Sequence, residues 1–463
     1  MNAAVPDIEI SEELIRRFDT LGPRYTSYPT ADRFRANFSA QNTIRYLEQR
    51  AGRSHNPPLS VYVHLPFCES LCYFCACNKI ITNDHGKVAE YLHYLDREMT
   101  MVAGHLGTER ETIQLHFGGG TPTFLSADEL GQLMRMLRSH FNFTADAELG
   151  IEIDPRTVSP DTLAMLAGLG FNRTSFGVQD FDPAVQEAVN RIQPREMVET
   201  AIVASRRAGF ESINADLIYG LPKQTLSSFD RTLDQLIELV PDRIALYNYA
   251  HLPNRFKGQR LIRAADLPSA EDRLQIFLMS MRRLLDAGYR YIGLDHFAKP
   301  DDELNVAREN GTLHRNFQGY TTRAECDLVA FGMSAISKVG DSYSQSSHSV
   351  TGYYKHLEEG RLPTEKGCQL SRDDVLRRTV IMEIMCGGPL RFPAINQRYE
   401  IDFIRYFDAE LARLIPYQEA GLIEITVEGI FVSPKGRLFV RGVGLVFDKY
   451  LRQPTTSSYS KLI

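Results

Sequence analysis

The sequence has no apolar run that approaches the roughly 20 residues of a membrane-spanning helix, and it has no low-complexity tract. Its first ten residues contain neither the basic region nor the apolar region of a secretory signal. The formal net charge of −6 leaves no excess of basic residues, so a general nucleic-acid or anionic-membrane partner is not expected. These absences indicate a soluble cytoplasmic protein, and 463 residues suffice for one large domain and a smaller one.

Cysteine is also scarce, with seven residues in the whole chain. Four of them lie within the ten residues Cys68-Glu-Ser-Leu-Cys72-Tyr-Phe-Cys75-Ala-Cys77, whereas Cys326, Cys368 and Cys386 are isolated. A structural zinc site would need a second cysteine pair, and none is present. A disulfide framework is typical of small secreted proteins, so it is disfavoured as well.

The spacing C-x3-C-x2-C allows the thiolates of Cys68, Cys72 and Cys75 to hold one face of a 4Fe–4S cube. Ferredoxin-type clusters take four cysteine ligands, so three ligands leave one iron free to bind and activate another molecule. Cys77 could supply a fourth ligand, but the C-x-C step from Cys75 is short for two corners of one cube. We therefore predict a metal centre on Cys68, Cys72 and Cys75.

These residues carry a resemblance to a known superfamily. The C-x3-C-x2-C spacing directly after an apolar run, with Phe74 before the third cysteine, resembles the radical S-adenosylmethionine (SAM) superfamily. The longer strings Tyr62-Val-His-Leu-Pro-Phe67 and Cys72-Tyr-Phe-Cys75-Ala-Cys77-Asn-Lys79 are similar to the oxygen-independent coproporphyrinogen III oxidases. The resemblance extends from Pro23 to the C-terminal segment, and no motif position departs from it.

Short apolar runs alternate with amphipathic stretches from about residue 59, which predicts a parallel sheet built from βα units. The predicted strands are Leu59–Leu65, Thr112–Phe117, Leu149–Ile153, Thr174–Val178, Ile213–Ile218 and Ile244–Tyr249. The predicted helices are Ala89–Val102, Ala127–His140, Asp161–Leu169, Pro183–Val189, Arg195–Ala208 and Leu226–Leu239. Six units are fewer than the eight of a closed barrel. The predicted fold is α/β, and the resemblance implies a partial (β/α)6 TIM-like barrel of the radical SAM type.

Polar signals follow the predicted strands, where the chemistry of such folds collects. The second strand ends in Phe117-Gly-Gly-Gly-Thr-Pro-Thr123, whose bare backbone can approach charged ligand groups and which is not a P-loop. Glu152 and Asp216 are inward carboxylates, which are costly unless they are paired with a basic side chain or bind a ligand. Gln179 suits a ribose or carboxylate, and Arg191 can clamp a carboxylate.

The resemblance assigns these positions to two SAM molecules. The first matches Tyr62, Gly119, Glu152 and Ile336, and the second matches Phe74, Gly120, Thr121, Gln179, Arg191, Asp216 and Ala250. For Cys77 the resemblance supports a catalytic or pocket-lining role rather than ligation. Lys79, Arg24 and Arg315 are candidates for binding substrate carboxylates on the basis of charge alone.

Several segments lie outside the predicted barrel. Ser11–Phe18 predicts a short helix, and Pro23–Thr30 predicts either a surface loop or, by resemblance, an arm near the site. The polar strings Gly293–Glu303 and Leu313–Tyr320 predict an ordered surface loop outside the core, and they are characteristic of the resembled oxidases.

The C-terminal part predicts a smaller, mostly helical, winged-helix-like domain. It contains predicted helices at Asp373–Met385 and Ile401–Gln418, and a hairpin of Leu422–Val427 and Ile430–Val432. The expected division of the chain is an N-terminal helix and arm at 1–50, the catalytic barrel at 51–348 and this domain at 349–463.

The resemblance implies an oxidoreductase of haem and porphyrin biosynthesis. Its members use a 5′-deoxyadenosyl radical to convert two propionates of coproporphyrinogen III into vinyl groups, which gives protoporphyrinogen IX without oxygen. The implied partners are an electron donor such as flavodoxin or ferredoxin and an unidentified electron acceptor, with no nucleic acid and no membrane. We expect a cytoplasmic monomer.

Two other functions were weighed. A haem-trafficking chaperone of the same superfamily would share the cysteine triad but would lack Cys77 and the His314–Tyr320 string, both of which are present. A zinc-stabilised winged-helix regulator is disfavoured by the net acidity and by the six βα units.

Overall fold

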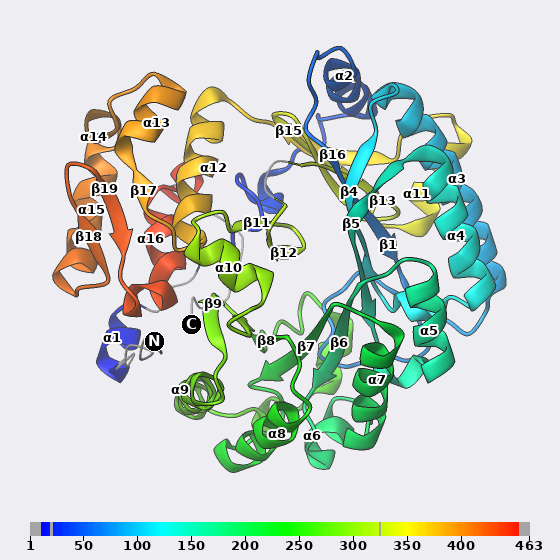
Figure 1. Ribbon diagram of the computed structural model, residues 1–463, viewed down its shortest axis with the longest axis horizontal. Coiled ribbons are helices and arrows are strands. Elements are labelled where there is room, and N and C mark those ends of the chain that lie inside the picture. Colours follow the sequence, from blue (N-terminus) through cyan, green and yellow to red (C-terminus); the bar gives the residue numbers. More distant parts are fainter. Residues whose placement is uncertain (1–10, 19–21, 324–325, 453–463) are drawn as a thin grey trace. The chain divides into compact units, whose positions relative to one another are not determined.

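The computed structural model describes residues 11–18, 22–323 and 326–452 (Figure 1). The chain forms two compact units, each discontinuous in sequence. Unit 1 comprises Met1–Phe34, Gly288–Ala324 and Leu370–Ile463, and unit 2 comprises Arg35–Ala287 and Glu325–Gln369. The sequence predicts three continuous domains, 1–50, 51–348 and 349–463. That division of the chain stays a prediction.

Unit 2 is built on one sheet with the strand order β16-β15-β14-β13-β1-β4-β5-β6-β7-β8. Strand β1 pairs in parallel with β4 and with β13, and each strand from β4 to β8 is parallel to the next. Strands β13 to β16 continue the sheet in antiparallel fashion. Their bounds are β1 Leu59–Leu65, β4 Glu111–Gly119, β5 Asn142–Ile153, β6 Arg173–Gln179, β7 Ser212–Tyr219, β8 Arg243–Asn248, β13 Asp327–Phe331, β14 Ile336–Val339, β15 Ser342–Ser346 and β16 Thr364–Gln369.

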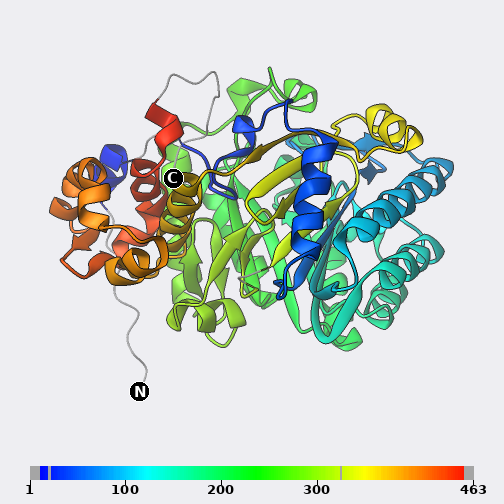
Figure 2. The same cartoon turned by 90° about the horizontal axis from the view of Figure 1, so that it is seen from above.

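The helices of unit 2 follow the strands and cover the outer side of the curved sheet (Figure 1). Their bounds are α2 Ala40–Ala51, α3 Gly86–Leu106, α4 Ala127–His140, α5 Pro160–Gly168, α6 Pro183–Ala188, α7 Arg195–Ala208, α8 Leu226–Glu238, α9 Ala270–Asp286 and α11 Val350–Glu358. Capping boxes fix several starts, as at α4, where Ser126 and Glu129 satisfy each other's backbone N–H groups. Helix α2 packs against β14, β15 and β16 (Figure 2).

The α/β parallel sheet predicted from the sequence is confirmed. All six predicted strands and all six predicted helices are present, and α4 and α7 have the predicted bounds. The largest boundary error is in β5, which begins at Asn142 rather than Leu149. The prediction did not include α2, α9, α11 or the antiparallel strands β14 to β16.

Unit 1 contains seven helices and seven short strands among the described residues. The helices are α1 Glu12–Phe18, α10 Glu303–Glu309, α12 Arg372–Met385, α13 Phe392–Tyr399, α14 Phe403–Tyr406, α15 Asp408–Glu419 and α16 Val440–Val446. The strands are β9 Arg290–Gly293, β10 His296–Ala298, β11 His314–Asn316, β12 Gly319–Thr321, β17 Leu390–Arg391, β18 Ile423–Ile425 and β19 Gly429–Val432.

Three predictions in unit 1 were wrong in detail. The segment Ile401–Gln418 is not one helix, because the backbone of Phe407 (φ −108°, ψ 25°) leaves the helical region between α14 and α15. The polar segment Gly293–Glu303 is not a surface loop, since Phe297 and Ala298 on β10 are buried. In the predicted hairpin, β18 is shorter than Leu422–Val427, β19 begins one residue before Ile430, and β17 adds a third strand.

The Pro23–Thr30 segment is not a surface loop either. Tyr25 and Tyr28 are 1% and 0% exposed, and they belong to the apolar core of unit 1. The Tyr25 hydroxyl donates to Asp448 Oδ2 at 2.9 Å. Whether this segment serves as an arm at the site stays a prediction.

None of the helices in the described part of the chain is long and apolar enough to cross a membrane.

Arg50 on α2 and Asp327 on β13 form a buried ion pair of 3.1 Å, with side chains 2% and 1% exposed. Replacing Arg50 with Met leaves the buried carboxylate to the more distant Lys338 Nζ at 3.8 Å and to the Gly340 N–H at 2.9 Å, which should cost about 3 kcal/mol in the free energy of unfolding. Urea unfolding measures this loss. The control is Arg195→Met, which removes exposed pairs to Glu199 and Glu238 and should cost about 1 kcal/mol or less. Equal losses in both variants would contradict this account.

Glu98 on α3 is a buried acid that accepts from the Tyr353 hydroxyl at 2.6 Å and from Gly332 N at 2.8 Å. Burial raises its pKa to about 7 from 4.5. The folded state therefore binds the proton more tightly than the unfolded state does. Between pH 4.5 and 7, ionisation of Glu98 should make the folded protein less stable as the pH rises.

The variant Glu98→Gln keeps a hydrogen-bond acceptor for Tyr353 and Gly332, but its side chain does not ionise. The difference in melting temperature, wild type minus variant, should therefore fall as the pH rises from 4.5 to 7. A difference that stays constant or rises over this range would show that Glu98 ionises normally in the folded protein.

Candidate functional site

The cysteine loop leaves the sheet after β1 and is closed at its base by a short parallel pair, β2 (Phe67–Cys68) and β3 (Ile80–Ile81). Ile80 N donates to Pro66 O at 2.7 Å. Inside the loop, Cys75 N donates to Cys72 O at 3.1 Å and forms a tight turn. This backbone arrangement holds Cys68, Cys72 and Cys75 within one short segment at the carboxyl end of β1.

The sulfur atoms of Cys68 and Cys72 are each contacted by side chains from other segments of unit 2. Cys68 Sγ lies 3.4 Å from the Thr121 hydroxyl. Cys72 Sγ accepts from Arg191 Nη1 at 3.5 Å and from Arg156 Nη2 at 3.6 Å. Burial, together with the nearby thiols of Cys75 and Cys72, raises the pKa of Cys68 to about 11. The three thiols are therefore close enough to interact electrostatically.

Cys77 lies beside the triad and its residue is exposed. A hydrogen bond between the two side chains lowers the pKa of Cys75 to about 6, and the same bond raises the pKa of Cys77 above its ordinary value. Lys79 donates to the carbonyl oxygens of Cys75 and Cys77 at 3.2 and 3.4 Å. Lys79, named as a candidate for substrate carboxylates, is thus engaged with the cysteine loop.

Asp154, directly after β5, holds both arginines that contact Cys72. Its carboxylate accepts from Arg156 Nη2 at 2.7 Å and from Arg191 Nη1 at 2.9 Å. Burial favours the neutral acid, but the hydrogen bond from Arg156 and the charge of Arg191 hold the pKa of Asp154 below its ordinary value. Arg191 also donates to Gly177 O at 2.7 Å and to Gln193 Oε1 at 3.1 Å, so its position is fixed on all sides.

The glycine segment after β4 packs against the start of the cysteine loop. Gly119 N donates to Glu152 Oε2 at 3.2 Å, and Thr121 N donates to Phe67 O at 2.8 Å. A Cβ on Gly120 would lie 2.6 Å from the carbonyl carbon of Pro66 and 2.7 Å from Phe67 O. Because these are backbone atoms, no larger residue fits at Gly120 without displacing the loop.

Glu152 on β5 is held by His116 and Gly119. His116 Nε2 lies 3.4 Å from Glu152 Oε1, and the His116 ring stacks on Tyr62 with 6.0 Å between centroids. Burial disfavours the charged form, but the hydrogen bond and charge of His116 lower the pKa of Glu152. The Tyr62 hydroxyl in turn lies 3.2 Å from His64 Nδ1. Tyr62 and Glu152, predicted to contact the first SAM, therefore belong to one network.

Asp216 on β7 accepts from Ser175 at 3.0 Å and from Asn214 at 2.8 Å. Burial, and then the negative charge of Glu152, raises the pKa of Asp216 to about 6. Gln179 ends β6 with a positive φ of 67°, and its Oε1 is buried without a hydrogen-bond partner among the described residues. Both groups can bind a polar ligand at this edge of the sheet.

The remaining candidates are apolar or lie elsewhere. Phe74 packs on the small core of Val185, Val189, Leu221, Tyr249 and Ile262. Ala250 follows β8, and Ile336 begins β14. Arg24 and Arg315 belong to unit 1, where Arg24 pairs with Asp295 and the Arg315 guanidinium lies 4.9 Å from the Tyr320 ring centroid.

The residues present fit a 4Fe–4S cluster and SAM. Within the described ranges, no three His, Cys, Asp or Glu side chains are arranged to hold a single metal ion, whereas a cube takes each thiolate on a different iron. Arg156 and Arg191 donate to Cys72 and Lys79 donates to the Cys75 carbonyl, so positive charge lies against two of the three predicted ligands. The carboxylates of Glu152 and Asp216 and the unsatisfied Gln179 Oε1 suit a ligand with an ammonium and a sulfonium group.

Sequence reasoning missed Asp154, Arg156 and His116. The string Asp154-Pro-Arg156 directly follows a strand end, which was the signal that could have drawn attention to it. His116 alternates with buried residues on β4 and so faces the same side of the sheet as its partner Glu152. These three residues position predicted site residues.

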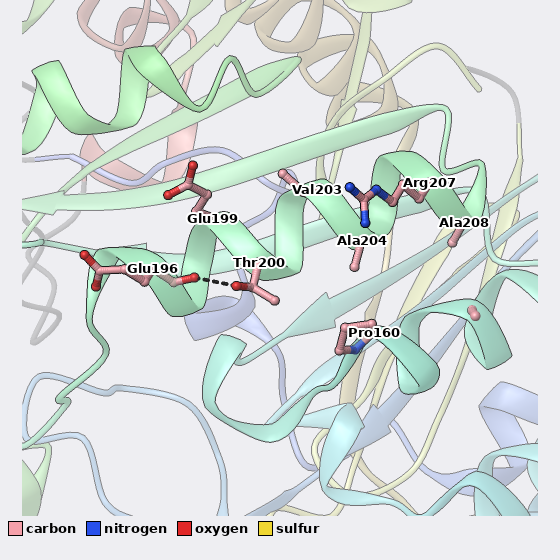
Figure 3. Close-up of a pocket in the computed structure, with 9 residues that line it drawn as sticks. Pro160, Glu196, Glu199, Thr200, Val203, Ala204, Arg207 and Ala208 are labelled. Atoms are coloured by element: carbon pink, nitrogen blue, oxygen red, sulfur yellow. Dashed lines mark hydrogen bonds between the residues drawn. The ribbon is translucent and has the colours of Figure 1, made fainter.

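A separate groove of about 470 Å³ lies on the outer side of the sheet between α5 and α7 (Figure 3). Pro160, Glu199, Val203 and Arg207 are among the residues that line it. None of its lining residues is a predicted site residue, so the strand-end cluster, and not this groove, is the candidate site.

Replacing Gly120 with Ala should displace the cysteine loop and cost about 1–3 kcal/mol of stability, because its Cβ would overlap the backbone of Pro66 and Phe67. The matched control is Gly104→Ala on α3, where a Cβ has no heavy atom within 4 Å. That change should stabilise the protein by about 0.5–1 kcal/mol. Thermal unfolding compares the two variants, and an unchanged melting temperature for Gly120→Ala would show that the loop accommodates the methyl group.

Comparison with known proteins identifies both parts of the chain. A model of the radical SAM superfamily matches residues 62–236, and a model described as the HemN C-terminal domain matches residues 370–439. The oxygen-independent coproporphyrinogen III oxidase of Pseudomonas aeruginosa is 49% identical over 453 residues, which cover 97% of this chain and 98% of that protein. The oxidase of Escherichia coli K12 is 46% identical over 450 residues, with 97% of each chain covered.

The fold agrees with a solved relative over nearly its whole length. The structure of coproporphyrinogen III oxidase (HemN) from Escherichia coli, described as a radical SAM enzyme, is similar with a TM-score of 0.89 and 46% identity. The match covers 92% of this chain and 97% of that one. The radical SAM fold predicted from the sequence is thereby confirmed, and the superfamily implies the cluster and SAM that the cysteine loop fits. The chain belongs to the family of oxygen-independent coproporphyrinogen III oxidases.

Proposed function

We propose that this protein catalyses the oxygen-independent oxidative decarboxylation of coproporphyrinogen III to protoporphyrinogen IX in haem biosynthesis. Two propionate side chains become vinyl groups, and each loses CO2, one hydrogen atom and one electron. The observation that carries the proposal is the cysteine loop, whose thiols contact Thr121 after β4, Arg156 after β5 and Arg191 after α6. Family membership gives the substrate, because the relatives are oxidases of coproporphyrinogen III.

Cys68, Cys72 and Cys75 would hold the cluster, with one iron free for the amino and carboxylate groups of SAM. When bound, the cluster and SAM supply a 5′-deoxyadenosyl radical that removes hydrogen from the β-carbon of a propionate. The residues of this chain bind and orient the cofactors and the substrate, and they exclude water from the site. Gly119 N donates to Glu152 Oε2 at 3.2 Å and so holds the carboxylate that would receive the ammonium group of SAM.

A second SAM molecule belongs to the proposal as well. Its predicted contacts include Thr121 and Arg191, which here touch Cys68 and Cys72, and Gln179, whose Oε1 is left unsatisfied. Arg191 is already bonded to Asp154, Gly177 and Gln193. It would therefore meet a ligand as a fixed positive charge, without having to reorganise.

The partners proposed are a one-electron donor such as flavodoxin or ferredoxin and an acceptor for the substrate electron. We propose a cytoplasmic monomer that binds neither nucleic acid nor membrane. We also retain residues 51–348 as the catalytic barrel and 349–463 as the C-terminal domain.

Anaerobic turnover tests the function. The reconstituted protein is given SAM, dithionite and coproporphyrinogen III, and the porphyrins are separated after oxidation. A tri-carboxylate product followed by a di-carboxylate product, together with 5′-deoxyadenosine, is the expected result. Formation of 5′-deoxyadenosine without decarboxylation would mean that the protein cleaves SAM but acts on a different substrate. Haem binding with neither product would favour the chaperone function.

Arg156→Gln should make the cluster harder to reduce, because Cys72 loses a charged hydrogen-bond donor that stabilises the more negative reduced state. We expect the equilibrium constant for reduction to fall about tenfold, which is about 59 mV for one electron. A redox titration followed by electron paramagnetic resonance (EPR) measures the potential. Arg135→Gln on α4 is the control, and an unchanged potential in Arg156→Gln would contradict the assigned role.

Cys77→Ser separates ligation from a pocket-lining or catalytic role. Because Cys77 is exposed and bonds to Cys75, we expect iron content and SAM cleavage to match the wild type while decarboxylation falls. Iron analysis and product analysis measure the two effects. Loss of the cluster in this variant would mean that Cys77 is needed as a ligand.

A further inference from the structure

The segment that follows β8 carries an exposed cluster of positive charge. Residues 252–263 contain no acidic residue and four basic ones, Arg255, Lys257, Arg260 and Arg263, and all four are exposed. Of the four, Arg263 pairs with Asp266 at 3.5 Å. The chain as a whole has a net charge of −6, so this concentration runs against its composition. We call these four residues the basic surface.

The basic surface is fixed directly to the cysteine loop. Gln259 is 1% exposed, and its Nε2 donates to Phe74 O at 3.0 Å, between Cys72 and Cys75. A Cβ on Gly258 would lie 3.5 Å from Tyr73 O, and the buried Ile262 shares a small core with Tyr73 and Phe74. The apolar and amide side of the segment therefore faces the loop, while the basic side chains point to solvent.

The end of the cysteine loop contacts His348. Asn78 donates to His348 O at 2.9 Å. Burial and then the charge of Lys366 lower the pKa of His348, Glu365 opposes this shift, and Arg255 adds to it. The exposed Leu261, 57% accessible, adds an apolar group within the basic surface.

We propose that the basic surface docks a small acidic one-electron carrier protein, which reduces the cluster at this face. The inference rests on the proposed function, which needs one electron for each SAM cleaved. The carrier is oxidised by one electron and the cluster is reduced by one, and no bond is broken or formed in this transfer. A mixed basic and apolar surface suits the small, transient interfaces of redox encounters.

Charge complementarity selects an acidic protein as the occupant. Cationic residues at the rim of an interface steer an anionic partner and mainly raise the association rate, with strong dependence on salt. Contact between the segment and the backbone of Phe74 places such a partner against the loop that holds the thiols. A nucleic acid would need a longer basic stripe than these twelve residues provide.

The test compares two triple charge reversals. The docking variant is Arg255→Glu, Lys257→Glu and Arg260→Glu, and the control is Lys87→Glu, Arg97→Glu and Arg135→Glu on α3 and α4, all exposed residues. Reduced bacterial flavodoxin is the probe, and cluster reduction is followed by stopped flow and by EPR at several salt concentrations. Dithionite replaces flavodoxin in parallel samples.

The docking variant should be reduced by flavodoxin about tenfold or more slowly at low salt, with a flatter salt dependence, while the control follows the wild type. Reduction and turnover with dithionite should be unchanged in both variants. Equal flavodoxin rates in the two variants would overturn the proposal. An equal loss of the reduction rate with dithionite would overturn the proposal too, because the substitutions would then act by disturbing the structure of the cysteine loop. Tight binding of DNA to the basic surface, with normal flavodoxin rates, would point to a nucleic acid instead.

Failure of the proposed function gives a different result. If the wild type never converts coproporphyrinogen III with dithionite, the substrate assignment is wrong. Flavodoxin-dependent reduction of the cluster can still be measured in that case, and it tests the docking surface independently.

Discussion

The site depends on the two positive charges that this fold places against a buried sulfur. Cys72 is buried, and a thiolate there is costly without compensation. Asp154 provides this compensation indirectly. Its Oδ2 accepts from Arg156 Nη2 at 2.7 Å and from Arg191 Nη1 at 2.9 Å, and both guanidinium groups also donate to Cys72. Asp154 is itself stabilised by these two cations. One carboxylate at the end of β5 therefore aligns two arginines on the sulfur of Cys72.

Two carboxylates lie on the same sheet, Glu152 on β5 and Asp216 on β7. Glu152 and Asp216 interact through space, and the negative charge of Glu152 helps to raise the pKa of Asp216. His116 and Gly119 hold Glu152 in place, and a Cβ on Gly118 would lie 2.9 Å from its Oε1. The site thus has cations beside the thiols and carboxylates beside the glycines. This separation matches SAM, whose ammonium and sulfonium groups need anionic partners while the thiolates need cationic ones.

The sequence predicted the parallel sheet because buried strands and amphipathic helices differ in period, and both signals are strong between residues 59 and 239. It did not predict β15, since Ser342-Tyr-Ser-Gln-Ser346 is polar and reads as a loop. The site was predicted where residues follow strand ends, because parallel strands share one edge. The contact of Arg156 with Cys72 spans 84 residues and depends on Asp154, and spacing along the chain carries no sign of it. The break at Phe407 was missed because both flanking segments are helical in composition.

The central claim is that this site removes a hydrogen atom from a propionate β-carbon. Coproporphyrinogen III carrying deuterium at those carbons tests it directly, with the 5′-deoxyadenosine recovered after turnover and examined by mass spectrometry. The account predicts that the 5′-deoxyadenosine gains one deuterium for each vinyl group formed. Vinyl products accompanied by unlabelled 5′-deoxyadenosine would contradict it.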